Sequence, residues 1–246
     1  MSDEYHIGDN PIFLSQVLRS ALQRYQQAFQ LFVTVSLVYA ILGEVGGLIL
    51  SRLTLKNEEL LFFKAVINIL LASWASIAII HASSQLVQGK AVTFDQALSV
   101  ARRKYALYLA VYLTLLFIMG FGFILFVLPG LYFATVFLFT DILVVVENAK
   151  FRSSFQWSAR LVRPFFWKVL SYLFIVIGIS LIPELIFQLG SKLYPSLGSG
   201  IHKVMAVLIM PYLMIAQVEL YYQIKTRLGE QLNFREETDE RTFPDE

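Results

Sequence analysis

The segment Phe126–Asn148 reads FVLPGLYFATVFLFTDILVVVEN. From Leu131 to Val146 its side chains suit a lipid environment, except for the carboxylate of Asp141. Of the 246 residues in the chain, 57% are hydrophobic and 15% are charged, whereas a soluble domain carries about 25% charged residues. The mean hydropathy is +0.63. This composition predicts an all-α, polytopic membrane protein, so that Asp141 would lie in an apolar surrounding.

The apolar residues fall into blocks that are each long enough to cross a bilayer core of about 30 Å. The blocks are 31–50, 60–80, 105–128, 131–146, 165–190 and 203–222. The fourth block is short, and we interpret Pro129 and Gly130 before it as a structural turn, a tight reversal within one long apolar region. Pro183 in the fifth block predicts a kink or break. We therefore expect one membrane domain, 1–246, with six transmembrane helices arranged as three hairpins.

The distribution of basic residues predicts the orientation of these helices. No basic segment followed by a short apolar core opens the chain, so we expect no cleavable signal peptide. Of the 20 Lys and Arg residues, 15 lie in the N-terminal segment, the second and fourth connections and the C-terminal segment. The positive-inside rule assigns this richer side to the cytoplasm. Both termini are then cytoplasmic, and 230–246 forms a polar cytoplasmic tail.

A repeated pattern precedes the first, third and fifth spans. The three segments are FLSQVLRSALQRY (13–25), FDQALSVARRKY (94–105) and FRSSFQWSARLVRPF (151–165). Each has helical periodicity with one apolar face, and Thr93 and Gln96 have the spacing of a capping box. We expect amphipathic interfacial helices at 11–29, 93–104 and 150–164, each leading into a hairpin. The alternative is that any helix before a span has this pattern.

The basic side chains of the second and third interfacial segments are candidate contacts for a partner. Each Lys or Arg near an anionic membrane surface contributes about 1 kcal/mol to attraction. The expected partner is anionic lipid of the cytoplasmic leaflet, with another membrane protein as an alternative and no nucleic acid. The candidate residues are Arg102, Arg103, Lys104, Arg152, Arg160 and Arg163.

Ionisable residues within the apolar blocks form a second candidate group, because such groups are costly at bilayer depth. They are Glu44, Lys64, His81, Asp141, Glu184 and Glu219. One interpretation is a polar path or an ion-coupled site through the bundle. The other, which we favour, is that each group is paired near an interface. We expect Glu44 to pair with Lys64, and Asp141 with His81 or a basic side chain of the fourth connection.

Catalytic motifs are not apparent. The chain has no cysteine and three histidines, which lie far apart in the sequence, and it contains no zinc-protease, phosphate-loop or nucleophile-elbow motif. Absence of cysteine excludes disulfides and cysteine nucleophiles. We expect neither an enzyme nor a bound cofactor or metal.

Three features resemble one family. Leu128-Pro129-Gly130, the apolar run to Glu147 and the following SSFQWSARLVRPFFW (153–167) are similar to the YciC-type bacterial inner-membrane proteins. That family is related to the membrane domain found beside glycerophosphodiester phosphodiesterases. The resemblance extends over the whole chain, including GKAVTFDQALSVA (89–101). It implies a multi-pass protein of the bacterial inner membrane, and the family has no established biochemical role. It also implies an uncharged residue at the position of Asp141, where this chain departs from the pattern.

Two functions remain open on these grounds. The first is a non-catalytic accessory or envelope-maintenance module that contacts anionic lipid or a membrane partner. The alternative is a small-solute transporter or channel, or a lipid-handling protein, that uses a polar seam between the hairpins. We favour the first, because the charges concentrate at the expected interface.

Overall fold

The computed structural model describes residues 13–53, 56–193 and 195–229, and these residues form only helices and short connections. The expected all-α class is therefore confirmed. Six helical segments in this part of the chain are long and apolar enough to cross a membrane. The elements are α1 (Leu14–Gln27), α2 (Phe29–Ser51), α3 (Asn57–Val87), α4 (Phe94–Leu125), α5 (Val127–Val136), α6 (Thr140–Val146), α7 (Phe151–Val162), the 3-10 helix η1 (Arg163–Phe165), α8 (Phe166–Leu193) and α9 (Pro195–Arg227).

Helix α4 begins with the capping box that the sequence predicts. Thr93 Oγ1 accepts a hydrogen bond from Gln96 N at 3.4 Å, and Gln96 Oε1 accepts one from Thr93 N at 3.0 Å. The predicted interfacial helix at 93–104 is not separate, because it forms the first turns of α4, which continues to Leu125. No proline or glycine occurs between Phe94 and Met119 to end the helix earlier. By contrast, α1 ends before Ala28, and α7 passes at Arg163 into η1, which contains Pro164.

The fourth apolar block is divided. The chain reverses at Phe126, whose φ and ψ are −164° and 154°, rather than at Pro129 and Gly130. Both of these residues lie in the first turns of α5, where proline is tolerated. Gly130 is required for packing, because a Cβ there would come within 2.6 Å of the Phe123 ring of α4. A second interruption separates α5 from α6, so the block is two short helices and not one.

The sequence predicts a kink or break at Pro183. Helix α8 continues through this proline as far as Leu193, so the chain does not break there, and a kink stays a prediction. Proline removes one backbone hydrogen bond from a helix. In a long apolar helix, local adjustments can restore the lost bonding.

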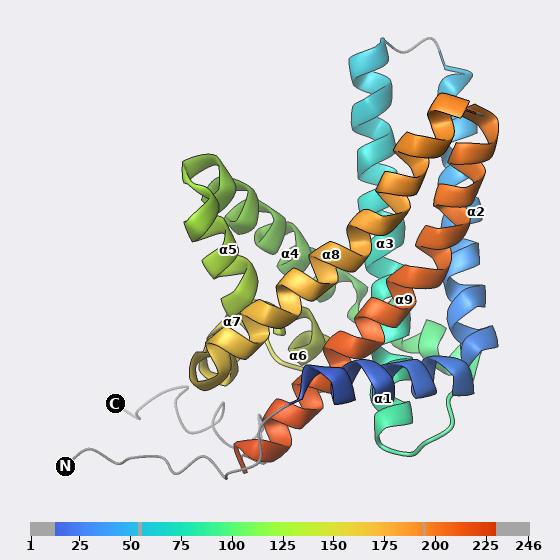
Figure 1. Ribbon diagram of the computed structural model, residues 1–246. Coiled ribbons are helices and arrows are strands. Elements are labelled where there is room, and N and C mark those ends of the chain that lie inside the picture. The colour runs from blue at the N-terminus through green and yellow to red at the C-terminus, as the bar shows by residue number, and fades with distance from the viewer. Residues whose placement is uncertain (1–12, 54–55, 194, 230–246) are drawn as a thin grey trace, which may run out of the picture.

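Many of the fully buried side chains lie at one end of the molecule, which we call the basal layer: α1, α6 and α7 with the parts of α3, α4 and α9 that contact them. In Figure 1, α1 crosses this end beside α9, and α6 and α7 lie at the same end. Above it, α4 and α5 form an arm that diverges from α2 and α3, while α8 runs obliquely between the two. The fully buried side chains of α6 (Ile142, Leu143) and of α9 (Ile215, Leu220) belong to the basal layer.

Candidate functional site

Asp141 lies in the first turn of α6, directly after the interruption between α5 and α6. Its Oδ1 accepts a hydrogen bond from Ile142 N at 2.8 Å and one from Gln217 Nε2 at 3.3 Å. The first N–H groups of a helix have no partner within the helix, and a negative charge there is favourable. The neighbour that binds Asp141 is thus a neutral amide from α9, where the sequence predicted His81 or a basic side chain.

The backbone groups released by the interruption also have partners. Gln217 Nε2 donates to Leu138 O at 2.6 Å. Ser158 Oγ of α7 donates to Val136 O at 2.8 Å and accepts from Phe139 N at 3.2 Å. In a membrane, a broken helix is tolerated where neighbouring side chains satisfy its backbone. Side chains of α7 and α9 therefore stabilise the backbone at the interruption between α5 and α6.

Three tyrosines, Tyr108, Tyr112 and Tyr172, interact electrostatically with Asp141. Tyr172 donates to Leu213 O at 3.0 Å, which ties α8 to α9. Asp141 is consequently part of a polar cluster whose hydrogen bonds join helices.

Two ion pairs fix the basal layer. Arg24 of α1 pairs with Glu219 of α9, and its Nη1 also donates to Leu86 O at 2.6 Å at the end of α3. Lys225 Nζ lies 2.5 Å from Glu147 Oε1, which also accepts from Tyr221 Oη at 2.6 Å. Glu219 is thus paired, as our favoured interpretation expected. Sequence reasoning missed the second pair, because Glu147 and Lys225 mark the ends of apolar blocks and resemble ordinary boundary charges.

Lys104 differs from the other basic candidates. Its Nζ donates to Val145 O in the last turn of α6, where the carbonyl end of a helix attracts a cation. His81 of α3 is half-buried and lies within electrostatic range of Lys104 and Arg103. The structure therefore brings His81 to the basic side chains of α4, and Lys104 supports α6.

The remaining basic candidates are exposed. They are Arg102 and Arg103 on α4, Arg152 and Arg160 on α7, and Arg163 in η1. Two of them line a recess of about 540 Å³, which we call the Arg recess. It is formed by Tyr132, Val136, Ala159, Arg160, Arg163 and Phe166.

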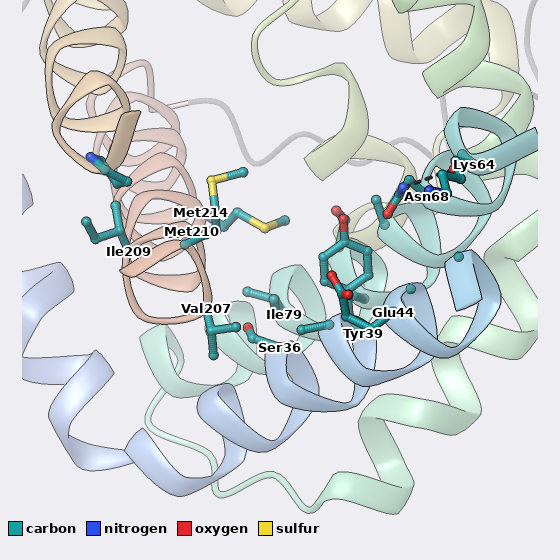
Figure 2. A pocket seen from close by; sticks show the side chains of 18 of the residues that line it. Ser36, Tyr39, Glu44, Lys64, Asn68, Ile79, Val207, Ile209, Met210 and Met214 are labelled. Carbon is teal, nitrogen blue, oxygen red and sulfur yellow. Dashed lines mark hydrogen bonds between the residues drawn. The ribbon is translucent and has the colours of Figure 1, made fainter. Parts of the chain in front are cut away.

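A separate cavity of about 620 Å³ lies between α2, α3, α8 and α9. Figure 2 shows Tyr39 and Ile79 at this cavity, with Met210 and Met214 facing it from α9. Glu44 and Lys64 also line it, so the structure brings this predicted pair to one site. Glu184 follows Pro183, which lines the cavity, but the Glu184 side chain lies exposed on the surface of α8.

The chain was compared with protein-family models, with curated proteins and with solved structures, and none of the three comparisons gave a match. The resemblance to the YciC-type proteins therefore stays a prediction. The site must be interpreted from its own geometry.

Proposed function

We propose that this chain is a multi-pass protein of the bacterial inner membrane with six spans in three hairpins. The basal layer faces the cytoplasm, and both termini lie on that side. Its role is non-catalytic: an accessory or envelope-maintenance module that holds anionic lipid of the inner leaflet. The observation that carries this proposal is the Arg recess, in which two exposed arginines stand beside aromatic side chains.

The state of the other charges supports a lipid-contact role over ion transport. Glu219 and Glu147 are engaged in ion pairs, and the Asp141 carboxylate is hydrogen-bonded to α6 and α9. A coupling site needs a group that exchanges its partner during transport. The arginines of α4, α7 and η1 lie instead on the exposed surface, where each Lys or Arg contributes about 1 kcal/mol to attraction for anionic lipid.

The test neutralises the five exposed arginines together. The variant combines Arg102→Gln, Arg103→Gln, Arg152→Gln, Arg160→Gln and Arg163→Gln. We expect it to retain less anionic lipid than wild type after purification, with a weaker dependence on salt. The control changes Arg52→Gln and Lys56→Gln at the other ends of the spans, and should retain the wild-type amount. Equal retention by all three proteins would refute the proposal.

The cavity favours a second candidate, a lipid-handling or small-solute transport role. Its volume of about 620 Å³ falls within the range of about 300–1,000 Å³ typical of ligand sites. Filling it with Val207→Trp should then abolish complementation of a deletion strain under envelope stress, while the protein stays folded. The matched control is Leu61→Trp, because Leu61 is exposed on α3. Full complementation by a stably folded Val207→Trp protein would exclude a role for the cavity.

A further inference from the structure

The Arg recess is built where an interfacial helix turns into a span. Helix α7 ends at Val162, and the chain passes through η1 into α8. The buried side chains Leu161, Val162 and Phe165 anchor this corner from within. Arg160 and Arg163 are three residues apart, which places them on the same side of the helical turn. The buried anchors thus fix the backbone that carries both guanidinium groups.

The opposite wall comes from α5. Tyr132 and Val136 are four residues apart and therefore lie on one face of that helix. The Tyr132 ring packs against that of Phe166, with the ring centroids 5.8 Å apart. The recess thus has a cationic side from α7 and η1 and an aromatic side from α5 and α8. Such a change from charge to apolar surface is typical of the headgroup boundary of a membrane.

The cationic side is suited to a phosphate group. A guanidinium group presents several N–H donors in a plane that matches phosphate oxygens, often in pairs. The Arg160 guanidinium lies 5.1 Å from the centre of the Trp157 ring. This cation–π contact restricts Arg160 before a ligand arrives and lowers the entropy lost on binding.

We propose that the Arg recess is a specific site for one anionic glycerophospholipid drawn from the surrounding bilayer. Arg160 and Arg163 bind the phosphate, and the upper part of one acyl chain lies along Tyr132, Val136 and Phe166. The recess volume of about 540 Å³ fits a headgroup with the beginning of a chain. This inference rests on the proposed function and adds a defined site to the general attraction of basic residues.

The experiment compares two variants with the same change in charge. The first is Arg160→Gln/Arg163→Gln in the recess, and the control is Arg102→Gln/Arg103→Gln on α4. Each full-length protein is placed in nanodiscs that contain phosphatidylglycerol and a zwitterionic lipid, and bound lipid is counted by native mass spectrometry. We expect wild type and the control to retain one tightly held phosphatidylglycerol. The recess variant should bind it about tenfold or more weakly, because hydrogen bonds to a charged group are lost.

A second variant tests the site even if the Gln variant fails to fold. Arg160→Lys/Arg163→Lys keeps both charges but loses the paired donors of the guanidinium groups. Its affinity for the retained lipid should fall between those of wild type and the Gln variant. Wild-type affinity in the Lys variant would show that charge alone is recognised, and would overturn the specific site.

The remaining outcomes separate the two proposals. An equal loss in the recess variant and the α4 control would overturn the Arg recess as a defined site and leave the general lipid contact standing. No loss in either would overturn both. Displacement of the retained lipid by millimolar inorganic phosphate would show that free phosphate, and not a membrane lipid, is the ligand.

Discussion

The basal layer and the α4–α5 arm are both rich in apolar side chains, but they place them differently. Ile142 in α6 is 0% exposed, whereas Ile124 and Leu128 in the arm are 83% and 77% exposed. Soluble proteins rarely expose an apolar surface of this kind over a large area, and six apolar helices are compatible with a multi-pass membrane protein. Hydrophobicity alone therefore does not tell which segments pack together in this chain.

Polar side chains distinguish the two regions. The basal layer contains the ion pairs of Glu219 and Glu147 and the hydrogen bonds of Ser158 and Gln217. In the arm, α4 and α5 meet through two glycines, since a Cβ on Gly122 would come within 3.0 Å of Gly130 Cα. The first region is held by directional bonds and the second by close helix packing. Variants in each region can test this difference.

The largest effect is expected from Glu219→Ala. Removing one partner of a buried ion pair leaves the other charge unpaired, which costs about 3 kcal/mol. We take the low end of that range because the Arg24 side chain keeps 26% exposure. Unfolding of the purified protein by heat measures the loss, with the exposed Glu58→Ala as control. The double variant Arg24→Ala/Glu219→Ala should lose less stability than the two single variants lose together. If the losses of the single variants simply add, the pairing is contradicted.

Gly130→Ala should have the next largest effect. The added methyl group would meet the Phe123 ring at 2.6 Å, and overpacking of this kind costs about 1–3 kcal/mol. Gly120→Ala is the matched control, because a Cβ there meets nothing within 4 Å. Thermal unfolding should show a loss of stability for Gly130→Ala and not for Gly120→Ala. Similar stability of the two variants would mean that α4 and α5 do not approach closely at Gly130.

The effect of replacing Asp141 should depend on whether the new side chain can still accept a hydrogen bond. Asp141→Asn keeps an oxygen that accepts from Ile142 N and Gln217 Nε2, so stability and complementation should stay near wild type. Asp141→Leu loses that acceptor and should cost about 1–3 kcal/mol. A stable Asn variant that fails to complement a deletion strain would contradict the structural role and favour the transport candidate.

The smallest effect, of opposite sign, is expected at Tyr25 in α1. Its side chain is 8% exposed, and its hydroxyl has no hydrogen-bond partner in the described part of the chain. Tyr25→Phe should therefore raise stability by about 1 kcal/mol. A destabilised Phe variant would reveal a partner for the hydroxyl.

Burial also raises the pKa of Tyr25 above its ordinary value of 10.0. The folded protein then keeps this proton to a higher pH than the unfolded chain. The free energy of unfolding is therefore unaffected by this group below pH 10, and it falls as pH rises from 10 through the raised pKa, because ionisation of the buried hydroxyl is costly. Unfolding measured above pH 10 should show a smaller alkaline loss in Tyr25→Phe than in wild type.

Much of the helical architecture was predictable from local signals. The apolar blocks located the long helices, and Thr93 with Gln96 located the start of α4. The local pattern did not show that 94–105 continues into the long apolar helix α4, because a separate amphipathic helix and the start of a longer one have the same period. The interruption before Thr140 was also hidden, since its stabilising partners Ser158 and Gln217 come from distant segments.

The candidate sites were predictable only in part. Sequence reasoning selected Arg160 and Arg163, but not the wall formed by Tyr132 and Phe166, which requires knowledge of how α5 and α8 pack. It also grouped Lys104 with the exposed basic residues, although its bond to Val145 O directs it toward α6. Pairing across helices depends on tertiary packing, and the spacing within one helix does not reveal it.

The central claim is that the basal layer lies at the cytoplasmic face while the α4–α5 arm lies in lipid. The chain has no cysteine, so single-cysteine variants can test this with a membrane-impermeant maleimide. We predict that Gln156→Cys on the exposed face of α7 is labelled in inverted membrane vesicles and not in intact spheroplasts. Phe117→Cys, in the middle of the α4 span, should be labelled in neither. Labelling of Gln156→Cys from outside, or ready labelling of Phe117→Cys from water, would contradict the account.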